Sequence, residues 1–357
     1  MKDNAAVIQR ELDQLSAAGG RVTLACRRYD LARALVIDTP SLCLCGEVWS
    51  YSADPNGVFE SPFGTKLRLV GQANPAVFVG KTRTLGGVIV RDLGVQGDIA
   101  GMDTRPLVDP ESPARSAGIC FDAVRTDQCE FSKLSFCGLS NAICATGQAE
   151  LDACIFERVN MDGCGNGVWF APRAAYYTQF RGCIAADNPY YGFYADGRWR
   201  SIHNLELKDT HFVRNGGAFA DTAEHPAAVL WLGINRSAVD HCLIDDAGTF
   251  WYYDADAAEN NQRQPSHRRT VGLWVIGNEN RITDNTITHS SDDAIRVEGK
   301  GNVLLSNIVD GSIRVRGEGN TVVNAVLTRP DARLILEGAA AASTTVIGVP
   351  EERVVRG

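Results

Sequence analysis

The chain has 357 residues, of which 45% are hydrophobic and 22% charged, with 35 glycines and a formal net charge of -8. This composition excludes a disordered chain, and an acidic balance without any Lys/Arg-rich run argues against a nucleic-acid-binding surface. No run of about 18 apolar residues is present, so we expect no transmembrane helix and no membrane partner.

The first predicted element is an amphipathic helix that ends at Gly19 and Gly20. Its apolar face consists of Val7, Ile8, Leu12 and Leu15. We predict one domain in which residues 1–20 cap a stack of coils, residues 21–345 form the coils, and residues 346–357 are a tail. The start of the chain lacks the apolar core of a signal peptide, so we expect a cytoplasmic protein, or a secreted one only if a leader was removed.

A short apolar strand that follows a small residue recurs along the rest of the chain. The central residues of these strands are Ile119, Ile143, Val168, Phe193, Val229, Leu273, Ile295, Ile313 and Leu334. Most steps are roughly 20 to 25 residues long, and no repeat contains a convincing helix pattern. The sequence therefore predicts an all-β fold, a parallel β-helix of about ten coils.

A second ladder places a cysteine, and later an asparagine, at one position of each coil. Its members are Cys129, Cys154, Cys183, Thr210 and Cys242, followed by Asn285, Asn307 and Asn324. Equivalent residues of successive coils lie about 4.8 Å apart, so we expect the four cysteines to form one buried, reduced stack. Turn asparagines can hydrogen-bond along such a stack. The cysteines lack the spacing of a zinc site, and we expect no metal and no cofactor.

The opening of the chain resembles that of a known superfamily. The helix ending in Gly-Gly is followed by "VTLACRRYDL", "LVIDTPSLCLCG" and "GGVIVRDLGVQG", and a later coil reads "GNENRITDNTI". These stretches resemble the pectate-lyase-like right-handed β-helix proteins and, among them, the inulin fructotransferases. The resemblance implies right-handed coils, a carbohydrate-active enzyme with an acidic pair near a subunit boundary, and a homotrimer. Asp187 and Asp196 are the approximate counterparts of that pair.

Unequal steps between strands locate the longer loops. Three long segments, 97–116, 213–227 and 247–269, leave the coils at the same corner. Two shorter excursions, 171–179 and 195–203, leave from the opposite corner. Binding sites of solenoids are typically built from loops on one face of a rigid scaffold, so we predict a groove between these two walls.

The predicted groove combines acids with aromatic rings, and this composition suits the apolar faces and hydroxyl groups of sugars. The candidate catalytic carboxylates are Asp196, Glu224 and Asp254. The candidate substrate-binding residues are Tyr191, Tyr194, Arg198, Trp199, Trp251, Tyr252 and Asp256. Asp196 leads because it ends a strand of the scaffold. An alternative interpretation is that the aromatic rings only hold the loops on the solenoid.

The stretch "THSSDDAIRV" contains two adjacent acids, Asp292 and Asp293. Such a pair is typical of polygalacturonases, but the companion Asn-Thr-Asp, Gly-His-Gly and Arg-Ile-Lys motifs of that family are missing here. The pair stands where a coil turns into its first strand, as Gly311 and Ser312 do one coil later, and Asp is a favoured turn residue. We interpret the pair as a turn whose side chains diverge.

Four functions fit these observations. The first is an enzyme that cleaves or rearranges a glycosidic bond of an oligo- or polysaccharide with two carboxylates, as a hydrolase or an intramolecular fructosyltransferase. A uronate lyase or epimerase needs a base with cation clamps, for which Arg198, Arg200, Arg268 and Arg269 are available. A sugar-binding β-helix needs only the aromatic groove. The fourth is an isomerase or cyclase of a non-sugar metabolite.

Overall fold

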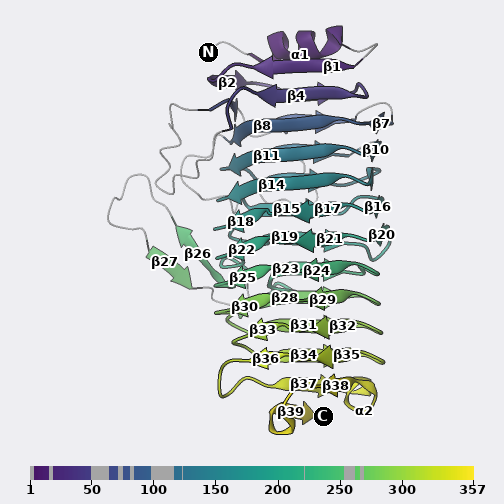
Figure 1. Ribbon diagram of the computed structural model, residues 1–357. Coiled ribbons are helices and arrows are strands. Elements are labelled where there is room, and N and C mark those ends of the chain that lie inside the picture. The colour runs from purple at the N-terminus through teal and green to yellow at the C-terminus, as the bar shows by residue number, and fades with distance from the viewer. Residues whose placement is uncertain are drawn as a thin grey trace.

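The computed structural model describes residues 4–15, 19–49, 64–70, 75–80, 84–97, 116–122, 124–220, 222–252, 262–265 and 269–357. For residues 250–252 and 262–265 it describes the backbone alone. Across these ranges the strands stack coil upon coil along one axis, so the predicted all-β parallel β-helix is confirmed (Figure 1). Among the described helices, none has the length and apolar character needed to cross a lipid bilayer.

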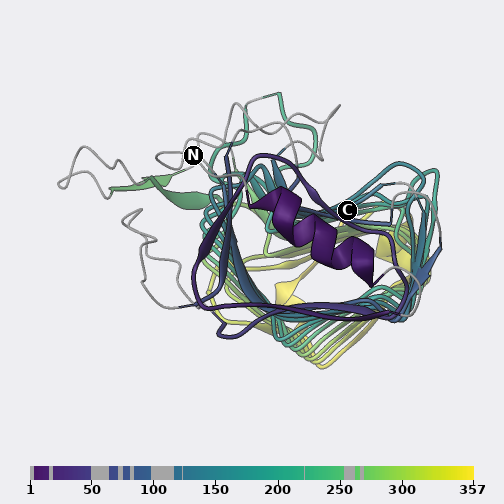
Figure 2. The same cartoon turned by 90° about the horizontal axis from the view of Figure 1, so that it is seen from above.

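The helix α1 (Ala5–Gln14) lies across the open end of the first coils (Figure 2). Ala5, Ile8 and Leu12 are buried against the core, whereas Val7 is 45% exposed and does not share the predicted face. Gln9 both donates to the carbonyl of Val36 at 3.0 Å and accepts from its backbone N–H at 2.7 Å. The helix therefore satisfies part of a strand edge that would otherwise be open to pairing.

One flank of the solenoid is a parallel sheet with twelve strands in the described part of the chain. Its strands are β3 (Leu35–Ile37), β6 (Val77–Val79), β9 (Ala117–Phe121), β12 (Asn141–Ala145), β15 (Asn166–Phe170), β19 (Phe193–Asp196), β23 (Ala227–Leu232), β28 (Val271–Ile276), β31 (Ile295–Glu298), β34 (Ile313–Arg316), β37 (Leu334–Glu337) and β39 (Val354–Arg356). The predicted apolar ladder is confirmed residue by residue, from Ile119 opposite Ile143 to Ile313 opposite Leu334.

The other flanks are a twenty-stranded and a five-stranded parallel sheet. The larger sheet holds β1 (Gly20–Leu24), β2 (Arg28–Leu31), β4 (Leu42–Gly46), β5 (Lys66–Leu69), β8 (Ile89–Gln96), β11 (Glu130–Cys137), β14 (Ile155–Asp162), β17 (Gln179–Arg181), β18 (Ile184–Ala186), β21 (Glu206–Lys208), β22 (His211–Val213), β24 (Ala238–Asp240), β25 (Leu243–Asp245), β29 (Arg281–Thr283), β30 (Thr286–Thr288), β32 (Val303–Leu305), β33 (Ile308–Val309), β35 (Thr321–Val323), β36 (Val326–Leu327) and β38 (Thr345–Ile347). The smaller holds β7 (Leu85–Gly86), β10 (Arg125–Asp127), β13 (Glu150–Asp152), β16 (Ala174–Tyr176) and β20 (Ser201–His203).

A hairpin, a short helix and a 3-10 turn lie outside the three parallel sheets. The predicted long loop 247–269 contains an antiparallel hairpin of β26 (Thr249–Tyr252) and β27 (Gln262–Pro265), which projects from the side of the stack (Figure 1). A short helix, α2 (Ala339–Ser343), and a 3-10 turn at Glu351–Arg353 lie near the other end of the chain.

Inward-facing aromatic rings stack along the middle of the solenoid. Phe156 lies between Phe131 and Phe180, with ring centroids 4.9 and 4.4 Å apart, and all three rings are buried. Parallel pairing forces identical positions of neighbouring coils into contact, so one apolar residue per coil produces a continuous core. The site residues on the outer faces are thereby attached to a rigid scaffold.

The predicted single cysteine stack is two stacks. Cys129 and Cys154 occupy one inward column, since Glu130 pairs with Ile155. Cys183 and Cys242 belong to a second column. There Thr210 holds the intervening place, and Asn285 accepts from the backbone N–H of Cys242 at 2.8 Å. All four thiols are buried and free, as expected.

The asparagine end of the ladder also needs a correction. Asn285 and Asn307 do stack, with a hydrogen bond of 3.0 Å from Nδ2 to Oδ1. Asn324 does not continue this column, because Ile308 pairs with Val326 and places Ala325 above Asn307. Asn324 instead has a positive φ of 51° and occupies the bend of the coil, a conformation that asparagine tolerates well.

Candidate functional site

The outer face of the twelve-stranded sheet carries a column of side chains that begins with two cysteines, continues with mostly aromatic residues and ends with two arginines. They follow the confirmed ladder by one residue and therefore point outward. In chain order the column is Cys120, Cys144, Trp169, Tyr194, Leu230, Trp274, Arg296 and Arg314. Trp169 stacks on Tyr194 with ring centroids 4.2 Å apart. The segments before β23 and β28 leave one edge of this face and the segment after β19 leaves the other, so the groove stays a prediction for this face.

Asp196 ends β19 at one edge of this face. Arg198 donates to its carboxylate through Nε at 3.1 Å, through Nη2 at 2.9 Å and through its backbone N–H at 3.1 Å. The hydroxyl of Tyr194 adds a fourth bond at 3.2 Å. Partial burial alone would raise the pKa of Asp196, but the hydrogen bonds and charge of Arg198 outweigh it and hold the pKa below its usual value. Asp196 is therefore suited to act as an ionised base or nucleophile rather than as a proton donor.

Glu224 and His225 lie in the loop between β22 and β23, within electrostatic reach of Arg198. Glu224 is 83% exposed, and its Oε2 lies 3.7 Å from Nδ1 of His225. The carbonyl of His225 accepts a hydrogen bond from Tyr191 at 3.3 Å, and the Tyr191 and Tyr194 rings are in contact. Burial lowers the pKa of His225, although the nearby Glu224 opposes this shift, so the imidazole is neutral at pH 7.

Trp274, Arg296 and Glu298 of this face were not among the predicted site residues. The ring of His225 meets the edge of Trp274 at 4.9 Å. Trp274 donates from Nε1 to Glu298 at 3.0 Å, and the guanidinium of Arg296 lies 4.3 Å above its ring. The ladder contained the signal for Trp274 and Arg296, because each follows a ladder residue by one position. A continuous chain of contacts thus links Asp196 to Arg296.

The other predicted residues have mixed outcomes. Trp199 is 94% exposed next to the Asp196 edge, an unusual position for such a large ring. Trp251 and Tyr252 belong to β26, but their side chains lie outside the part of the chain that the structure describes. Asp254 and Asp256 lie outside the described residues altogether.

Asp292 and Asp293 do form a bend before β31, but their side chains converge. Both accept hydrogen bonds from Nη2 of Arg296, at 3.1 and 2.8 Å. Asp293 is only 5% exposed and also accepts from Nε of Arg314 at 2.7 Å. The predicted divergence is wrong because strand alternation does not apply to a bend. Asp293 connects two coils by accepting from an arginine of each.

A second pair of acids lies where the twenty-stranded sheet turns toward the twelve-stranded one. Asp187, an approximate counterpart of the fructotransferase acids, is buried and receives two bonds from Arg214 at 2.6 and 2.7 Å. Asp162 lies one coil earlier, and its Oδ1 is buried without a hydrogen-bond partner among the described residues. Burial raises the pKa of Asp162 to about 7, and the charge of Asp187 adds to this shift. Sequence pattern could not identify Asp162, since its shift arises from burial between coils.

The raised pKa of Asp162 makes stability depend on pH. The protonated carboxyl fits the fold, so its stabilising contribution is full below the unfolded pKa of about 3.8 and is lost as pH rises through about 7. We expect Asp162→Asn, which is neutral at every pH, to be more stable than the wild type at pH 8, by at most about 4 kcal/mol. Thermal unfolding from pH 4 to pH 8 should show this gain grow with pH. Asp331→Asn, at an exposed ion pair, should show no such gain, and an equal gain in both variants would contradict the assignment.

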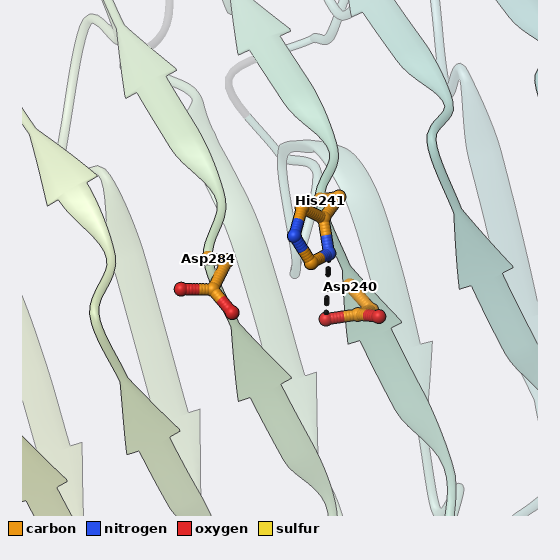
Figure 3. A group of neighbouring side chains, drawn as sticks. All are labelled: Asp240, His241 and Asp284. Carbon is orange, nitrogen blue, oxygen red and sulfur yellow. Dashed lines mark ion pairs between the residues drawn. The ribbon is translucent and has the colours of Figure 1, made fainter.

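Acids and histidines of adjacent coils also come together on the twenty-stranded sheet. Asp240, His241 and Asp284 place their possible ligand atoms within 4.8 Å of one another (Figure 3). Asp245, Asp246 and His289 do the same. Sequence motifs with short spacing do not reveal such groups, because their members come from neighbouring coils and are far apart in the sequence. In the first group, Asp240 is already bonded to Thr283 at 2.5 Å and paired with His241 at 3.1 Å. These contacts account for the grouping without an ion.

Comparison with known proteins supports the fold. No family model and no curated protein matches the chain. DFA-IIIase from Arthrobacter chlorophenolicus A6 in complex with GF2 matches with a TM-score of 0.72 and 14% identity, over 99% of this chain and 93% of that one. DFA-IIIase without its lid, also with GF2, matches with a TM-score of 0.71 and 15% identity over 99% and 94%.

A viral protein, ORF18 of Geobacillus virus E2, has a TM-score of 0.62 and 14% identity over 91% of this chain. The chain spans 57% of the length of that viral protein. At such identities the matches establish the architecture. They confirm the resemblance to the fructotransferase β-helix that the sequence predicted.

Proposed function

We propose that this chain is a carbohydrate-active enzyme that cleaves or rearranges a glycosidic bond on the outer face of the twelve-stranded sheet. The observation that carries the proposal is the unbroken chain of contacts from Asp196 and Arg198 through Tyr194 and Tyr191 to His225. It joins an ionised carboxylate to aromatic rings on one rigid face. DFA-IIIase, which has the same architecture, has been solved in complex with GF2 and with DFA-III, and this supports a sugar substrate.

Asp196 takes the role of the ionised carboxylate, because its ion pair with Arg198 lowers its pKa. Glu224 and Asp254 are the proposed proton donors. Two carboxyls about 5 to 9.5 Å apart can flank one glycosidic bond, so that one protonates the leaving oxygen while the other attacks carbon or deprotonates the incoming hydroxyl. Water as the incoming group gives hydrolysis. A hydroxyl of the substrate itself gives intramolecular fructosyl transfer.

The aromatic residues take the role of platforms for sugar rings. Trp199, at 94% exposure, and Tyr191 are proposed to contact the substrate directly, and Tyr194 supports Asp196 from below. Trp251, Tyr252 and Asp256 stay in the proposal as residues of the loop at the opposite edge. Arg198 donates to Asp196 through Nε and Nη2, so its Nη1 is the donor proposed to bind a sugar hydroxyl.

Incubation with a panel of glycans tests the proposed function. Inulin and other fructans, neutral hexose polymers and polyuronates are each mixed with the protein, and products are followed by mass and by ultraviolet absorbance. We expect products from a neutral glycan, either with one added water (hydrolysis) or as an anhydro sugar (transfer). An absorbance band of an unsaturated uronate would instead identify a lyase, and no product from any glycan would contradict the proposal.

Glycan binding without turnover is a second candidate function. It is favoured by the complete hydrogen bonding of Asp196, which gives this carboxylate a structural role. On this alternative the panel yields retained glycans without products, and Trp199→Ala removes the retention. A product of any kind excludes it.

A further inference from the structure

A polar cavity of about 400 Å³ lies at the C-terminal end of the same sheet face, beside the bend that precedes β31. Its volume falls in the range of small-molecule sites, about 300 to 1,000 Å³. Its polar lining includes Asp292, Asp293, Ser312, Arg314, Arg329 and Asp331. Most of this lining is carboxylate, hydroxyl and guanidinium, so the cavity suits a ligand rich in hydrogen-bonding groups.

Ion pairs centred on the buried Asp293 hold one wall of the cavity in place. Asp293, at 5% exposure, is shared between Arg296 and Arg314, and Arg314 also donates to Glu337. Each arginine comes from a different coil of the stack. A ligand that enters the cavity therefore meets groups whose positions are already set, which lowers the entropy cost of binding.

Several polar groups of the cavity lining have hydrogen-bond donors or acceptors that no described residue uses. Asp292 accepts from Arg296 through Oδ2, and within the described part of the chain Oδ1 has no protein partner. The hydroxyl of Ser312 accepts from the backbone N–H of Arg333 at 3.1 Å and still has its own proton to donate. Arg329 uses Nε and Nη2 on Asp331, so its Nη1 faces no bonded partner among the described residues. A ligand must therefore both donate and accept, as hydroxyl groups do.

The charge of the lining selects against anions. The described lining has three arginines (Arg269, Arg314 and Arg329) and four aspartates (Asp292, Asp293, Asp310 and Asp331), and these sum to one net negative charge. A uronate or phosphate would add like charge to this set. Among the described residues, the lining contains no aromatic ring on which a nucleobase could stack. We infer that the cavity binds one neutral sugar unit.

This inference rests on the proposed function, because it makes the cavity a subsite for the same glycan. Asp292 and Asp293 bind Arg296, Arg296 lies over Trp274, and Trp274 contacts His225. The cavity and the Asp196 region therefore lie along one face, and an extended glycan can reach both. The unit bound in the cavity would set the minimum length of the substrate.

The experiment measures sugar binding without turnover. D-fructose, D-glucose and D-galacturonate are titrated into the wild type, into the Asp292→Asn/Ser312→Ala double variant, and into the control Asp152→Asn on the five-stranded sheet. We expect at least one neutral monosaccharide to bind the wild type and the control at millimolar concentration, and its affinity to fall at least tenfold in the double variant. Circular dichroism and thermal unfolding check that the double variant is folded.

Three outcomes would overturn the inference: no binding of either neutral sugar, equal affinity in the double variant, or preferential binding of galacturonate. The result is independent of catalysis. If neutral sugars bind and the double variant loses them, the cavity is a sugar site even where the glycan panel gives no product. If products form but the double variant binds and turns over substrate normally, the proposed function stands and the cavity plays no part in it.

Discussion

Replacing Asp196 with asparagine should lower kcat/KM on the glycan substrate by about two to four orders of magnitude. Asparagine has the shape of the carboxylate but cannot attack carbon or accept a proton. Because Arg198 and Tyr194 can still donate to its oxygen, the local geometry should persist. We therefore expect KM to change less than kcat. Steady-state rates with the best substrate of the panel measure both.

Asp30 provides a matched control for this variant. Its side chain is 18% exposed, close to the 16% of Asp196, and Arg68 donates to it through Nε and Nη2 at 2.9 and 3.1 Å. Asp30→Asn therefore disturbs an equivalent ion pair at the N-terminal end, and activity should stay near that of the wild type. Near-full activity in Asp196→Asn, or an equal loss in Asp30→Asn, would show that Asp196 has no catalytic role.

The register of the twelve-stranded sheet could be predicted from the sequence because one physical rule determines it. Every coil must place an apolar side chain at the same inward position, whatever the length of its loops. Val229 and Leu273 are 44 positions apart and Ile295 and Ile313 only 18, yet each pair is aligned. The same register determines the outward column. Trp274 directly follows the ladder residue Leu273, so its outward position was predictable from the sequence.

The two cysteine columns could not be separated by residue type. Cys154 and Cys183 fill inward positions on either side of the bend in the twenty-stranded sheet, where Ile155 pairs with Gln179 but Asn160 pairs with Ile184. Both positions favour a small apolar side chain, so the sequence pattern is identical at each. Only the pairing distinguishes them.

Charged contacts between coils were the least predictable feature of the site. The bonds from Arg296 and Arg314 to Asp293 depend on side-chain rotamers and on which coil lies next to which bend. The raised pKa of Asp162 depends on what closes Oδ1 off from solvent. Neither the arginine bonds to Asp293 nor the pKa of Asp162 can be predicted from the spacing of residues along the sequence. The sequence therefore predicted a region that contains several candidate acids and did not identify which two of them form a pair.

Asp293→Ala should destabilise the protein by up to about 3 kcal/mol, because it removes the buried carboxylate that two arginines share and leaves Arg296 with only Asp292 and Arg314 with only Glu337. Arg296 and Arg314 would both lose their shared carboxylate, and they retain only 17% and 23% side-chain exposure. Urea unfolding followed by circular dichroism measures the change. We expect the loss to appear at pH 7 and to persist in high salt, since the pair is shielded from solvent.

The neighbouring acid is the control, since Asp292 and Asp293 share the same bend. Asp292 is 27% exposed in its side chain and bonds to Arg296 alone, so Asp292→Ala should cost less than about 1 kcal/mol. The two variants thus separate a carboxylate that holds the coils together from one that faces the cavity. Equal destabilisation would mean that the pair acts as one turn, as its sequence alone suggested. A stable Asp293→Ala that has lost all activity would instead move the catalytic carboxylate from Asp196 to this bend.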